Sequence, residues 1–532
     1  MAKRFIALFL MIVFAVCMSS CASVNKTQID TSEEIQQVNK EAPVRGGTLN
    51  LCMFEVDSLN PLNTQNENNS DVLRLMFDGL FSVMPDFSLE NNLCESYTVS
   101  EDGLLYSFLI KNDIQFHDGT ILNANDVDAS FKLIFEAQSF YAQRFSFVSS
   151  TSVSGMTWNV SLSEPVVNFP ALLDFPVLPA KDARMDNKIT NLSYIPIGTG
   201  IYKVSDYKQT KELNLVINEN HFSGKNPYIP DIKITFVSDR NAAISMFENL
   251  YVDILPDYVV NLDEYTPKRD MTKSITYPEN KLTFLGINNQ KPVLLSTSVR
   301  QAISMCIDKN TIVNNTKTRI ATPSYLPINP YYVYFSGEKD DYIYNVERAL
   351  SLLNNDGFYD NDSNGILEKS IYGETHSLSL NLLVNSENST RIKIAETIKA
   401  SLEKAGFYIN LSIVDFDTYK RRIERRDYDH FVGSVNISQN NDLSFMLQTD
   451  KNMFGISNEK IDLCLAQLKV LSNTTSILSV YVDLCSVLAE EMPISAIYYD
   501  NALLLCDKKI RGNIAPAESN VFINIHEWFI KE

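Results

Sequence analysis

The spacing of apolar residues along this chain predicts a mixed α/β fold. Apolar residues fill most positions of 378–384 and 408–414, as in strands, whereas the segment 391–405 between them repeats its apolar positions with a helical period. Gly406 follows that helix, at the position where a glycine commonly ends one. Strand, helix and strand in this order make a β-α-β unit, so we expect a parallel sheet here.

Further elements flank this unit on both sides. The same patterns predict four more helices and two more strands, at 298–307, 346–354, 459–471 and 477–491 for the helices and near 281–288 and 494–506 for the strands. In the first half of the chain, residues 105–110 predict an aromatic-rich strand. A helix is expected to follow it, capped by Asn123 or Asn125.

The first residues predict export. Lys3 and Arg4 precede an uncharged apolar run at 6–16, which is far shorter than the roughly 20 residues that a membrane-spanning helix needs. Small residues then lead to Cys21, a pattern that predicts a lipoprotein signal peptide over 1–20 and a lipidated cysteine at position 21. Ordinary secretion, with Cys21 as a chance thiol, is the alternative.

The residues around Cys21 refine this picture. Cys17 is the poorer lipidation candidate because bulky Val16 precedes it. Residues 21–43 are polar and lack aromatic side chains, so we expect a flexible tether that holds a folded domain away from the membrane.

Composition and charge narrow the class of protein. The chain has 532 residues, 45% of them hydrophobic, which is enough for a large packed core and too long for one small domain. Its net charge is −19, or −21 once Lys3 and Arg4 leave with the signal peptide. Such a charge disfavours nucleic acid and anionic lipid as partners, and it is compatible with cationic or zwitterionic ligands.

Motifs for catalysis or metal binding are few. The chain has no G-x-S-x-G, H-E-x-x-H or G-x-x-x-x-G-K-[ST] motif, and its five histidines are far apart in sequence. Its cysteines are scattered without a C-x-x-C pair, so those after position 21 are expected to be buried apolar residues, with one disulfide among them. Gly198-Thr199-Gly200 lacks the lysine of a phosphate loop and is expected to be a structural turn.

Two charged segments leave alternatives open. Residues 360–365 resemble the first half of a calcium loop, but Ile371 stands where the bidentate glutamate is expected and Glu368 compensates only in part, so a plain turn is favoured over weak calcium binding. The arginines of 421–426 lie on an expected helix, where a solvated face is favoured over an anion-binding or partner-binding patch.

The segment 93–134 carries the most specific pattern in the chain. It resembles the signature region of the family 5 extracellular solute-binding proteins, which are the oligopeptide, dipeptide and nickel receptors of ABC importers. The matching residues are Glu95, Ser96, Val99, Ser100, Asp102, Gly103, Tyr106, Phe108, Phe116, His117, Asp118, Gly119, Asp126, Val127, Ser130 and Phe131. Shorter matches extend the resemblance over nearly the whole mature chain, among them 46–49, 78–80, 196–202 and 299–303.

The resemblance implies an α/β fold of the periplasmic-binding-protein type, a type II two-lobed clamp with an extra subdomain on the first lobe. It places the first lobe at 44–70, 190–283 and 500–532, the inserted subdomain at 71–189 and the second lobe at 284–499. The chain would then cross between the lobes near 284 and 500, forming a hinge, and a ligand would be buried when the clamp closes.

The same resemblance points to ligand-binding residues in the second lobe. Peptide-binding relatives hold the ammonium group of the peptide with an aspartate that follows a Gly-Trp pair. In the corresponding stretch, 433–445, Ser438 lies near the aspartate position and Val435 or Asn436 near the tryptophan. Both expected residues are therefore missing, although Asp442 can substitute for the aspartate if the loop is shifted.

Fold analogy adds four candidates outside that loop. Glu55 and Asp57 follow the first strand, Arg144 follows the helix of the inserted subdomain, and Tyr325 lies in the second lobe. Each of these side chains can equally be structural.

The implied function is that of a substrate-binding lipoprotein of an ABC importer. We expect it to capture a peptide or peptide-like solute outside the cell and to deliver it to permease subunits, as a monomer that is lipid-anchored, with palmitate, on the extracytoplasmic face of the cell membrane. No cofactor, catalytic residue or nucleic acid is expected. The alternatives are a nickel or metallophore receptor of the same fold, a sensor or partner-docking protein, and a lipid-anchored surface hydrolase.

Overall fold

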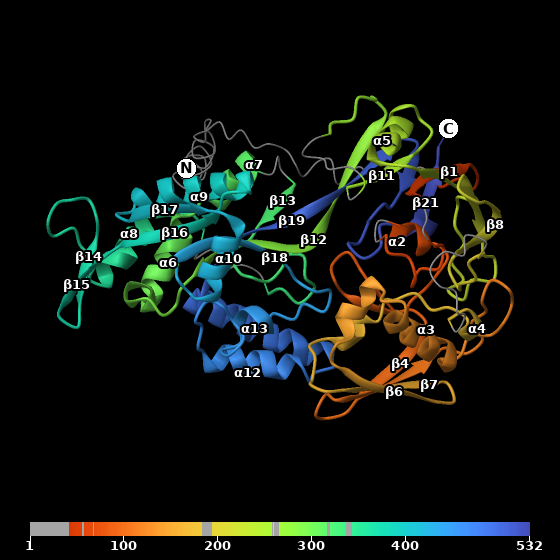
Figure 1. The fold of residues 1–532 in the computed structure, drawn as a ribbon, viewed down its shortest axis with the longest axis horizontal. Coiled ribbons are helices and arrows are strands. Elements are labelled where there is room, and N and C mark those ends of the chain that lie inside the picture. The colour runs from red at the N-terminus through yellow and green to blue at the C-terminus, as the bar shows by residue number, and fades with distance from the viewer. Residues whose placement is uncertain are drawn as a thin grey trace, which may run out of the picture. The chain divides into compact units, whose positions relative to one another are not determined.

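The computed structural model describes residues 42–55, 58–66, 69–183, 194–257, 259, 265–316, 320–336 and 343–531. Residues 44–532 form one unit by their contacts, and three larger sheets organise its described part (Figure 1). The predicted signal peptide over 1–20 and the predicted lipidation site Cys21 lie outside the described residues, as does the predicted tether up to residue 41.

The first sheet is built from the N-terminal strand and a later meander. Its strand order is β1 (Thr48–Phe54), β10 (Asp231–Val237), β9 (Glu212–Ile217) and β8 (Tyr202–Lys208). β1 pairs with β10 in parallel and the other pairs are antiparallel. On β1, every second side chain, Leu49, Leu51 and Met53, is buried, as expected for a strand with one face on a core.

The second sheet lies within 94–162 and is antiparallel throughout. Its order is β4 (Cys94–Val99), β5 (Leu105–Ile110), β7 (Thr157–Leu162) and β6 (Val148–Ser154). The predicted strand at 105–110 is confirmed as β5. Helix α3 (Ala124–Glu136) contacts this sheet, and Asn123 caps it as predicted, since its side chain accepts the Asn125 N–H and its own N–H donates to Asp126.

The turn at Gly198-Thr199-Gly200 is packed so closely that it leaves no room for a side chain. A Cβ atom at Gly200 would lie 2.4 Å from the Met76 carbonyl carbon, and one at Gly198 would lie 2.0 Å from the Met76 oxygen. Thr199 donates a hydrogen bond of 2.8 Å to the Asp78 carboxylate. These contacts fit the structural role that the sequence predicts for this turn.

His117 holds the same turn from the other side. Its Nδ1 accepts the Gly198 N–H at 3.3 Å, so its Nε2 carries the proton and donates to the Gly200 carbonyl at 3.0 Å. Burial lowers the pKa of His117, which keeps the ring neutral in this role. His117 of the signature region and the turn Gly198–Gly200 are thus joined in one structural unit.

The third and largest sheet contains two long strands. Its order is β11 (Ile254–Pro256), β19 (Ile494–Asp507), β12 (Thr272–Ile287), β18 (His430–Asn436), β16 (Ser379–Asn385) and β17 (Tyr408–Val414), with β13 (Ala321–Pro323) also paired to β19. β16 and β17 are parallel and are joined by α9 (Ser389–Glu403). The predicted β-α-β unit is therefore confirmed.

The two faces of the large sheet bury separate cores. Leu383 and Phe431 belong to a core with α12 (Glu459–Leu468) and α13 (Thr474–Glu491), whereas their neighbours Leu382 and Val432 belong to a core with α6 (Thr297–Cys306), α8 (Val346–Asn355) and α9. Adjacent strand residues point to opposite faces, which explains this division. The four helices predicted around the β-α-β unit are confirmed as α6, α8, α12 and α13.

The remaining elements are mostly short. The helices are α2 (Ser70–Leu73), α4 (Ala180–Ala183), α5 (Arg240–Glu248), α7 (Lys309–Thr316), α10 (Phe416–Glu424) and α11 (Ser444–Leu447), with 3₁₀ turns at Phe140–Phe145, Phe169–Leu172, Pro292–Leu295 and Ile525–Glu527. Three strand pairs complete the described part, β2 (Phe81–Val83) with β3 (Leu89–Asn91), β14 (Glu368–Ile371) with β15 (Glu374–Ser377), and β20 (Ile510–Gly512) with β21 (Trp528–Ile530).

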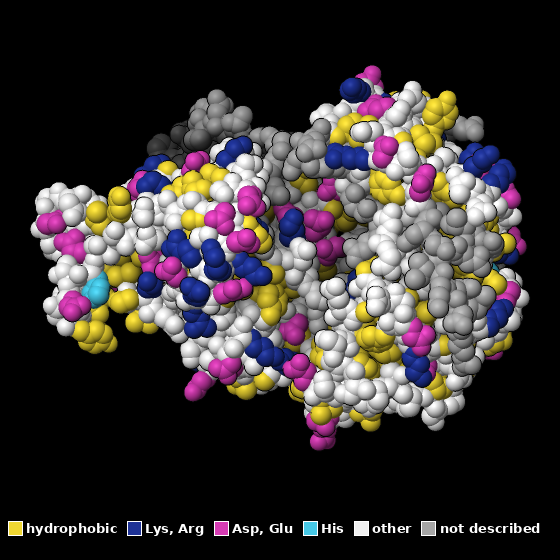
Figure 2. Space-filling model, viewed as in Figure 1, with side chains coloured by type: hydrophobic (Ala, Val, Ile, Leu, Met, Phe, Trp, Pro, Cys, Tyr) yellow, Lys and Arg dark blue, Asp and Glu magenta, His cyan; other side chains and the backbone are white. Residues whose placement is uncertain are grey.

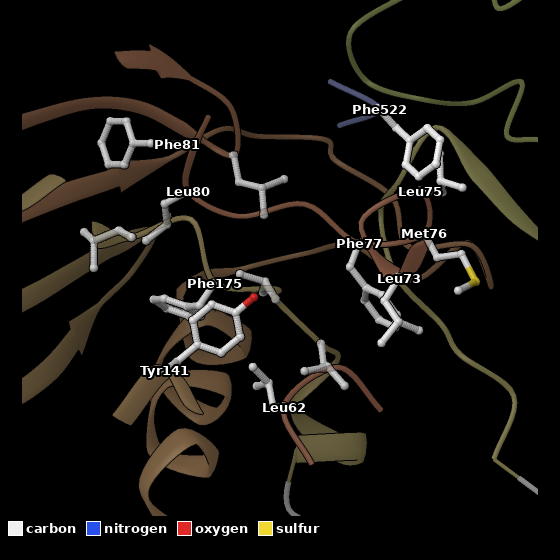
Figure 3. Close-up of a cluster of buried hydrophobic side chains, with 14 of the residues drawn as sticks. Leu62, Leu73, Leu75, Met76, Phe77, Leu80, Phe81, Tyr141, Phe175 and Phe522 are labelled. Atoms are coloured by element: carbon white, nitrogen blue, oxygen red, sulfur yellow. The ribbon is translucent and has the colours of Figure 1, made fainter. Parts of the chain in front are cut away.

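One core unites the first two sheets with the C-terminal segment. Figure 3 shows part of it, where Phe522 lies in the same cluster of buried side chains as Leu75 and Met76. Trp158 of the second sheet and Trp528 of β21 are both fully buried in this core. Residues from 49 to 528 therefore fold around a common interior, so the second sheet shares its core with the first.

The cysteines do not form the disulfide that the sequence analysis expected. The described cysteines after position 21 are all free thiols, and all but Cys52 are buried. They lie on six different elements, where each is packed as a small apolar residue. Separately, within the described residues no helix combines the length and apolar character needed to cross a membrane.

The packing of the glycine turn predicts a large and position-specific stability loss. Gly200→Ala should lower the free energy of unfolding by about 3 kcal/mol, because the new methyl group overlaps main-chain atoms that cannot move aside. Urea denaturation of the purified protein measures this loss. Gly155→Ala is the matched control, since nothing lies within 4 Å of a Cβ there and only the positive φ of 61° opposes it, at about 1 kcal/mol. Equal losses in the two variants would contradict the packing argument.

Candidate functional site

The pairing of β12 with β19 has two irregularities, one between Pro278 and Leu282 and a smaller one between Thr283 and Phe284. The first is the larger bulge. Pro278 pairs with Asn501 and Leu282 with Tyr499, so Glu279, Asn280 and Lys281 oppose a single residue, Asp500. Proline has no N–H to donate to a ladder, which explains why the strand leaves its partner just after Pro278. In Figure 1 the two strands run side by side through the middle of the view.

Asn280 fixes the shape of this bulge. Its side chain is buried, with 1% exposed, and its Nδ2 donates a hydrogen bond of 2.8 Å to Asn441. Its carbonyl oxygen accepts the Ile437 N–H at 2.7 Å, and Asn329 donates at 3.0 Å to the carbonyl of the preceding Glu279. The bulge is therefore held by two loops of the chain that lie far from it in sequence.

A cavity of about 360 Å³ lies beside the bulge. Acidic, basic and apolar residues from five segments line it, namely Arg240, Asp257, Val259, Tyr277, Glu279, Ala502 and Glu518. Figure 2 shows a hollow with acidic side chains near the middle of this face, over the region where β12 and β19 pass in Figure 1. The volume is in the range of small-molecule sites.

Tyr277 forms an inner wall of the cavity. It pairs with Ala502 across the two long strands, and only 6% of it is exposed. Burial raises the pKa of its hydroxyl well above the ordinary value, and the nearby carboxylates of Asp71, Glu279, Asp257 and Glu518 raise it further. The hydroxyl therefore stays protonated at any physiological pH.

Glu518 is an acid of the cavity whose pKa is perturbed. Surrounding protein raises the pKa of Glu518 to about 7, a hydrogen bond from the Asn280 backbone lowers it, and the Glu279 carboxylate raises it. The side chain nevertheless stays open to solvent through the cavity. Such a group changes its charge near neutral pH, which is typical of functional sites.

The carboxylates of this cavity are too dispersed for a bare metal ion. Among the described residues, only Asp360, Asp362 and Glu368 bring ligand atoms of three acidic, histidine or cysteine side chains within 4.8 Å of one another. Those three lie at the predicted turn, where Asp360 accepts the N–H groups of Asn364 and Gly365 at 3.0 Å. These hydrogen bonds hold the turn, and its three acidic side chains lie close enough together to hold a metal ion, so the choice between a plain turn and weak calcium binding stays a prediction.

A larger cavity of about 580 Å³ lies away from the bulge, between the β2–β3 hairpin, residues 221–225 and residues 520–526. His221 and Asp78 line it, with 3.6 Å between the His221 Nε2 and the carboxylate. The Asp78 carboxylate already accepts hydrogen bonds from Thr199 and Asn92. These bonds hold Asp78 against the turn at 198–200 and give it a structural role. This cavity is therefore a weaker candidate than the one beside the long strands.

The second-lobe candidates from the sequence lie near the bulge but do not line the cavity. Asn436 is exposed at the end of β18, opposite Lys281. The Ser438 carbonyl accepts a hydrogen bond of 3.4 Å from the Asn280 side chain. Asp442 accepts the Ser444 N–H at 2.8 Å. A ligand role for these three residues stays a prediction.

The other sequence candidates are spread over several elements. Glu55 is exposed and continues β1 by donating its N–H to the Val237 carbonyl. The ring of Tyr325 lies 3.9 Å from the ammonium of Lys309, and Tyr325 is 8% exposed. Asp57 lies outside the described residues. Neither Glu55 nor Tyr325 lines the 360 Å³ cavity.

Arg144 is the predicted residue with the clearest electrostatic link to the cavity. It forms an ion pair of 2.9 Å with the buried Asp174, which Arg74 also contacts at 2.7 Å. Its positive charge lowers the pKa of Glu518. Gln439 donates to the same Asp174 at 3.1 Å, so the loop after β18 is tied to this ion-pair cluster.

The arginines at 421–426 form the solvated face that the sequence favoured. Figure 2 shows basic side chains gathered over α10. Arg422 pairs with Asp427 at 3.2 Å, and Arg426 donates to the Asn452 carbonyl at 3.0 Å. Both arginines therefore have partners within the protein.

Sequence reasoning missed Asp257, Glu279 and Glu518. Each is a single acidic residue within an ordinary local context, and the three are hundreds of residues apart from first to last. The one available signal was Pro278, because a proline within a long strand marks a break where the neighbouring residue can turn toward a cavity.

Comparisons with known proteins agree with the fold. A family model described as "Bacterial extracellular solute-binding proteins, family 5 Middle" matches residues 88–453. The oligopeptide-binding protein AppA of Bacillus subtilis (strain 168) is 22% identical over 553 residues, covering 98% of this chain and 98% of AppA. The nickel-binding protein NikA of Staphylococcus aureus (strain NCTC 8325 / PS 47) is 22% identical over 442 residues, covering 82% of this chain and 85% of NikA.

Solved structures give the same result. The periplasmic murein tripeptide binding protein MppA, in its unliganded open form, superposes with a TM-score of 0.78 at 18% identity, covering 92% of this chain and 99% of MppA. AppA in complex with a nonapeptide gives a TM-score of 0.53 at 22% identity, covering 92% of this chain and all of AppA. The expected α/β fold of the periplasmic-binding-protein type is confirmed.

The raised pKa of Glu518 predicts a pH dependence of stability. Between about pH 4.5 and about pH 7 the native state holds a proton that the unfolded state has lost, so this group makes stability fall as the pH rises. Glu518→Gln removes that titration and keeps an acceptor for the Asn280 N–H. The melting temperature of E518Q, relative to the unchanged protein, should therefore rise from about pH 4.5 to about pH 7.5.

The control for this titration is Glu101→Gln, which neutralises an exposed acid that does not line the cavity. E101Q should follow the unchanged protein at every pH. Parallel melting curves for E518Q and the unchanged protein across this range would contradict the assignment.

Proposed function

The chain belongs to family 5 of the bacterial extracellular solute-binding proteins, and from that premise we propose that it captures a peptide or peptide-like solute outside the cell. It delivers this solute to the permease subunits of an ABC importer. The match of the family model over residues 88–453 is the observation that carries the proposal, since it includes most of the folded chain. The cavity beside the bulge of β12 supplies a place for the solute.

The long strands suggest how such a protein would hold its solute. The first lobe consists of 44–70, 190–283 and 500–532, the inserted subdomain of 71–189, and the second lobe of 284–499. These boundaries put both crossings within β12 and β19, close to the bulge at 279–281. A break in a ladder bends more easily than continuous pairing, so the bulge is the natural hinge of a clamp.

The loop 433–445 lacks the aspartate with which peptide-binding relatives hold the ammonium group of the peptide. The loop 433–445 offers Asn436, Ser438 and Asp442 as polar groups, and Glu55, Asp57, Arg144 and Tyr325 complete the set of candidate ligand-binding residues. A nickel or metallophore receptor remains the second possibility, supported by the similarity to NikA. The dispersed carboxylates of the cavity favour an organic solute over a bare ion.

The solute itself is the first test. The full chain, purified in mild detergent, should carry a peptide mixture when its native mass spectrum is compared with that of the denatured protein. A single co-purified metal chelate would replace the peptide with a metallophore, and turnover of a released compound would overturn the assignment as a non-enzymatic receptor. An empty protein that binds no member of a peptide library would contradict a peptide as the solute.

The lipid anchor gives a second test. Cys21→Ala should move the protein from the membrane fraction to the medium and abolish labelling with radioactive palmitate, because position 21 carries the acyl chains. Cys17→Ala is the matched control, since it removes a nearby thiol from the same signal peptide. Retention of palmitate in C21A would contradict the anchor at this cysteine.

A further inference from the structure

The loop 437–441 follows β18 and contacts two parts of the chain that lie far from it in sequence. On one side it holds the bulge of β12, because the Ile437 N–H donates to the Asn280 carbonyl at 2.7 Å and the Asn280 side chain donates to Asn441 at 2.8 Å. On the other side its residues 439–440 donate hydrogen bonds to the inserted subdomain. The loop therefore links the bulge to that subdomain.

Gln439 attaches the loop to a buried charge. Its Nε2 donates a hydrogen bond of 3.1 Å to the Asp174 carboxylate, and Asp174 is only 1% exposed. Arg74 and Arg144 hold the same carboxylate through ion pairs of 2.7 and 2.9 Å, so the acceptor is fixed in place before the loop reaches it. A hydrogen bond to a charged acceptor is worth more than one between neutral groups.

Asn440 makes the second contact and shows that the attachment is reversible in character. Its Nδ2 donates to the Val167 carbonyl at 2.8 Å, and the residue is 3% exposed. Within the described residues, however, the amide oxygens of Gln439 and Asn440 are both buried without a hydrogen-bond donor. A buried acceptor without a donor costs free energy, which offsets part of what the two hydrogen bonds contribute. Separation of the loop from the subdomain would return both oxygens to water.

An apolar interface surrounds these two contacts. Subdomain residues share the core of α12 and α13 with Tyr332, namely Val83, Phe87, Val167 and Ala171. Val167 thus contributes its side chain to this core and its carbonyl to Asn440. Next to Tyr332, the Val333 N–H donates to the Asp86 carbonyl at 2.9 Å, which joins the second lobe to the subdomain through the main chain.

We propose that Gln439 and Asn440 are positioning residues that latch the second lobe onto the inserted subdomain, and that the loop 437–441 couples this latch to the bulge of β12. The inference rests on the proposed function and names the residues that hold its clamp closed. The candidate ligand-binding residues Ser438 and Asp442 lie within or next to this loop, so a solute that contacts them acts on the latch directly.

Hydrogen exchange of the full chain in detergent, without any solute, tests the latch. The reporter is the Val333 amide, which neither Gln439 nor Asn440 contacts. Gln439→Ala and Asn440→Ala should each speed its exchange about tenfold, because loss of either hydrogen bond lets the two parts separate more often. Exchange of the amides in β16, on the large sheet, should stay unchanged.

Gln467→Ala is the matched control, since it truncates an exposed glutamine of α12 on the same lobe. Q467A should exchange as the unchanged protein does at Val333 and in β16. The double variant Q439A/N440A should exchange at Val333 at least as fast as the faster single variant.

Three results would overturn the latch. They are an unchanged Val333 exchange in Q439A and N440A, faster exchange confined to 437–445, and a rise at Val333 that β16 shares equally, which would mean a general loss of stability. Because no solute is used, any of them leaves the receptor function in place. Failure to find a peptide solute, in turn, leaves the exchange result valid.

Discussion

The pairing of β12 with β19 is the constraint on which the rest of this structure depends. Tyr277, Ala502 and Leu504 belong to the core shared with the first two sheets, whereas Leu282 and Tyr499 belong to a core on the large sheet. Each long strand is therefore fixed at both ends by separate apolar interiors. The two cores fix the positions of both strand ends, and this constrains the residues between them. At 279–281 the regular pairing of β12 with β19 is interrupted by the bulge.

The bulge is also where polar groups cross between distant parts of the chain. Asn280 receives or donates hydrogen bonds to the loops around 329 and 437–441, so its burial is matched by partners. The neighbouring Glu279 lines a cavity together with Glu518 and Asp257, so three acidic side chains from distant segments are grouped there. A fold selected only for stability would avoid such a grouping, and local departures of this kind are typical of functional sites.

The sequence predicted the elements whose signal is local and missed those that depend on distant contacts. The β-α-β unit, the strand β5 and the Asn123 cap follow from apolar spacing and from a short polar motif. The first half of β12 was missed because Lys273, Pro278 and Glu279 break its apolar pattern, although pairing with β19 stabilises it as a strand. In residues 272–279 the hydrogen bonds and packing with β19 therefore stabilise a strand that the residues alone would not favour.

The site residues were missed for a related reason. Counting along the loop 433–445 directs attention to Asn436 and Ser438, and the Ser438 carbonyl accepts a hydrogen bond from Asn280, next to the bulge. The acids beside that bulge are instead Glu279 in β12 and Glu518 in the C-terminal segment, and the surrounding protein raises the pKa of Glu518 in a way that no local pattern reveals. The packing of the two long strands therefore brings together acidic residues that are far apart in the sequence, which explains why no local pattern could reveal them.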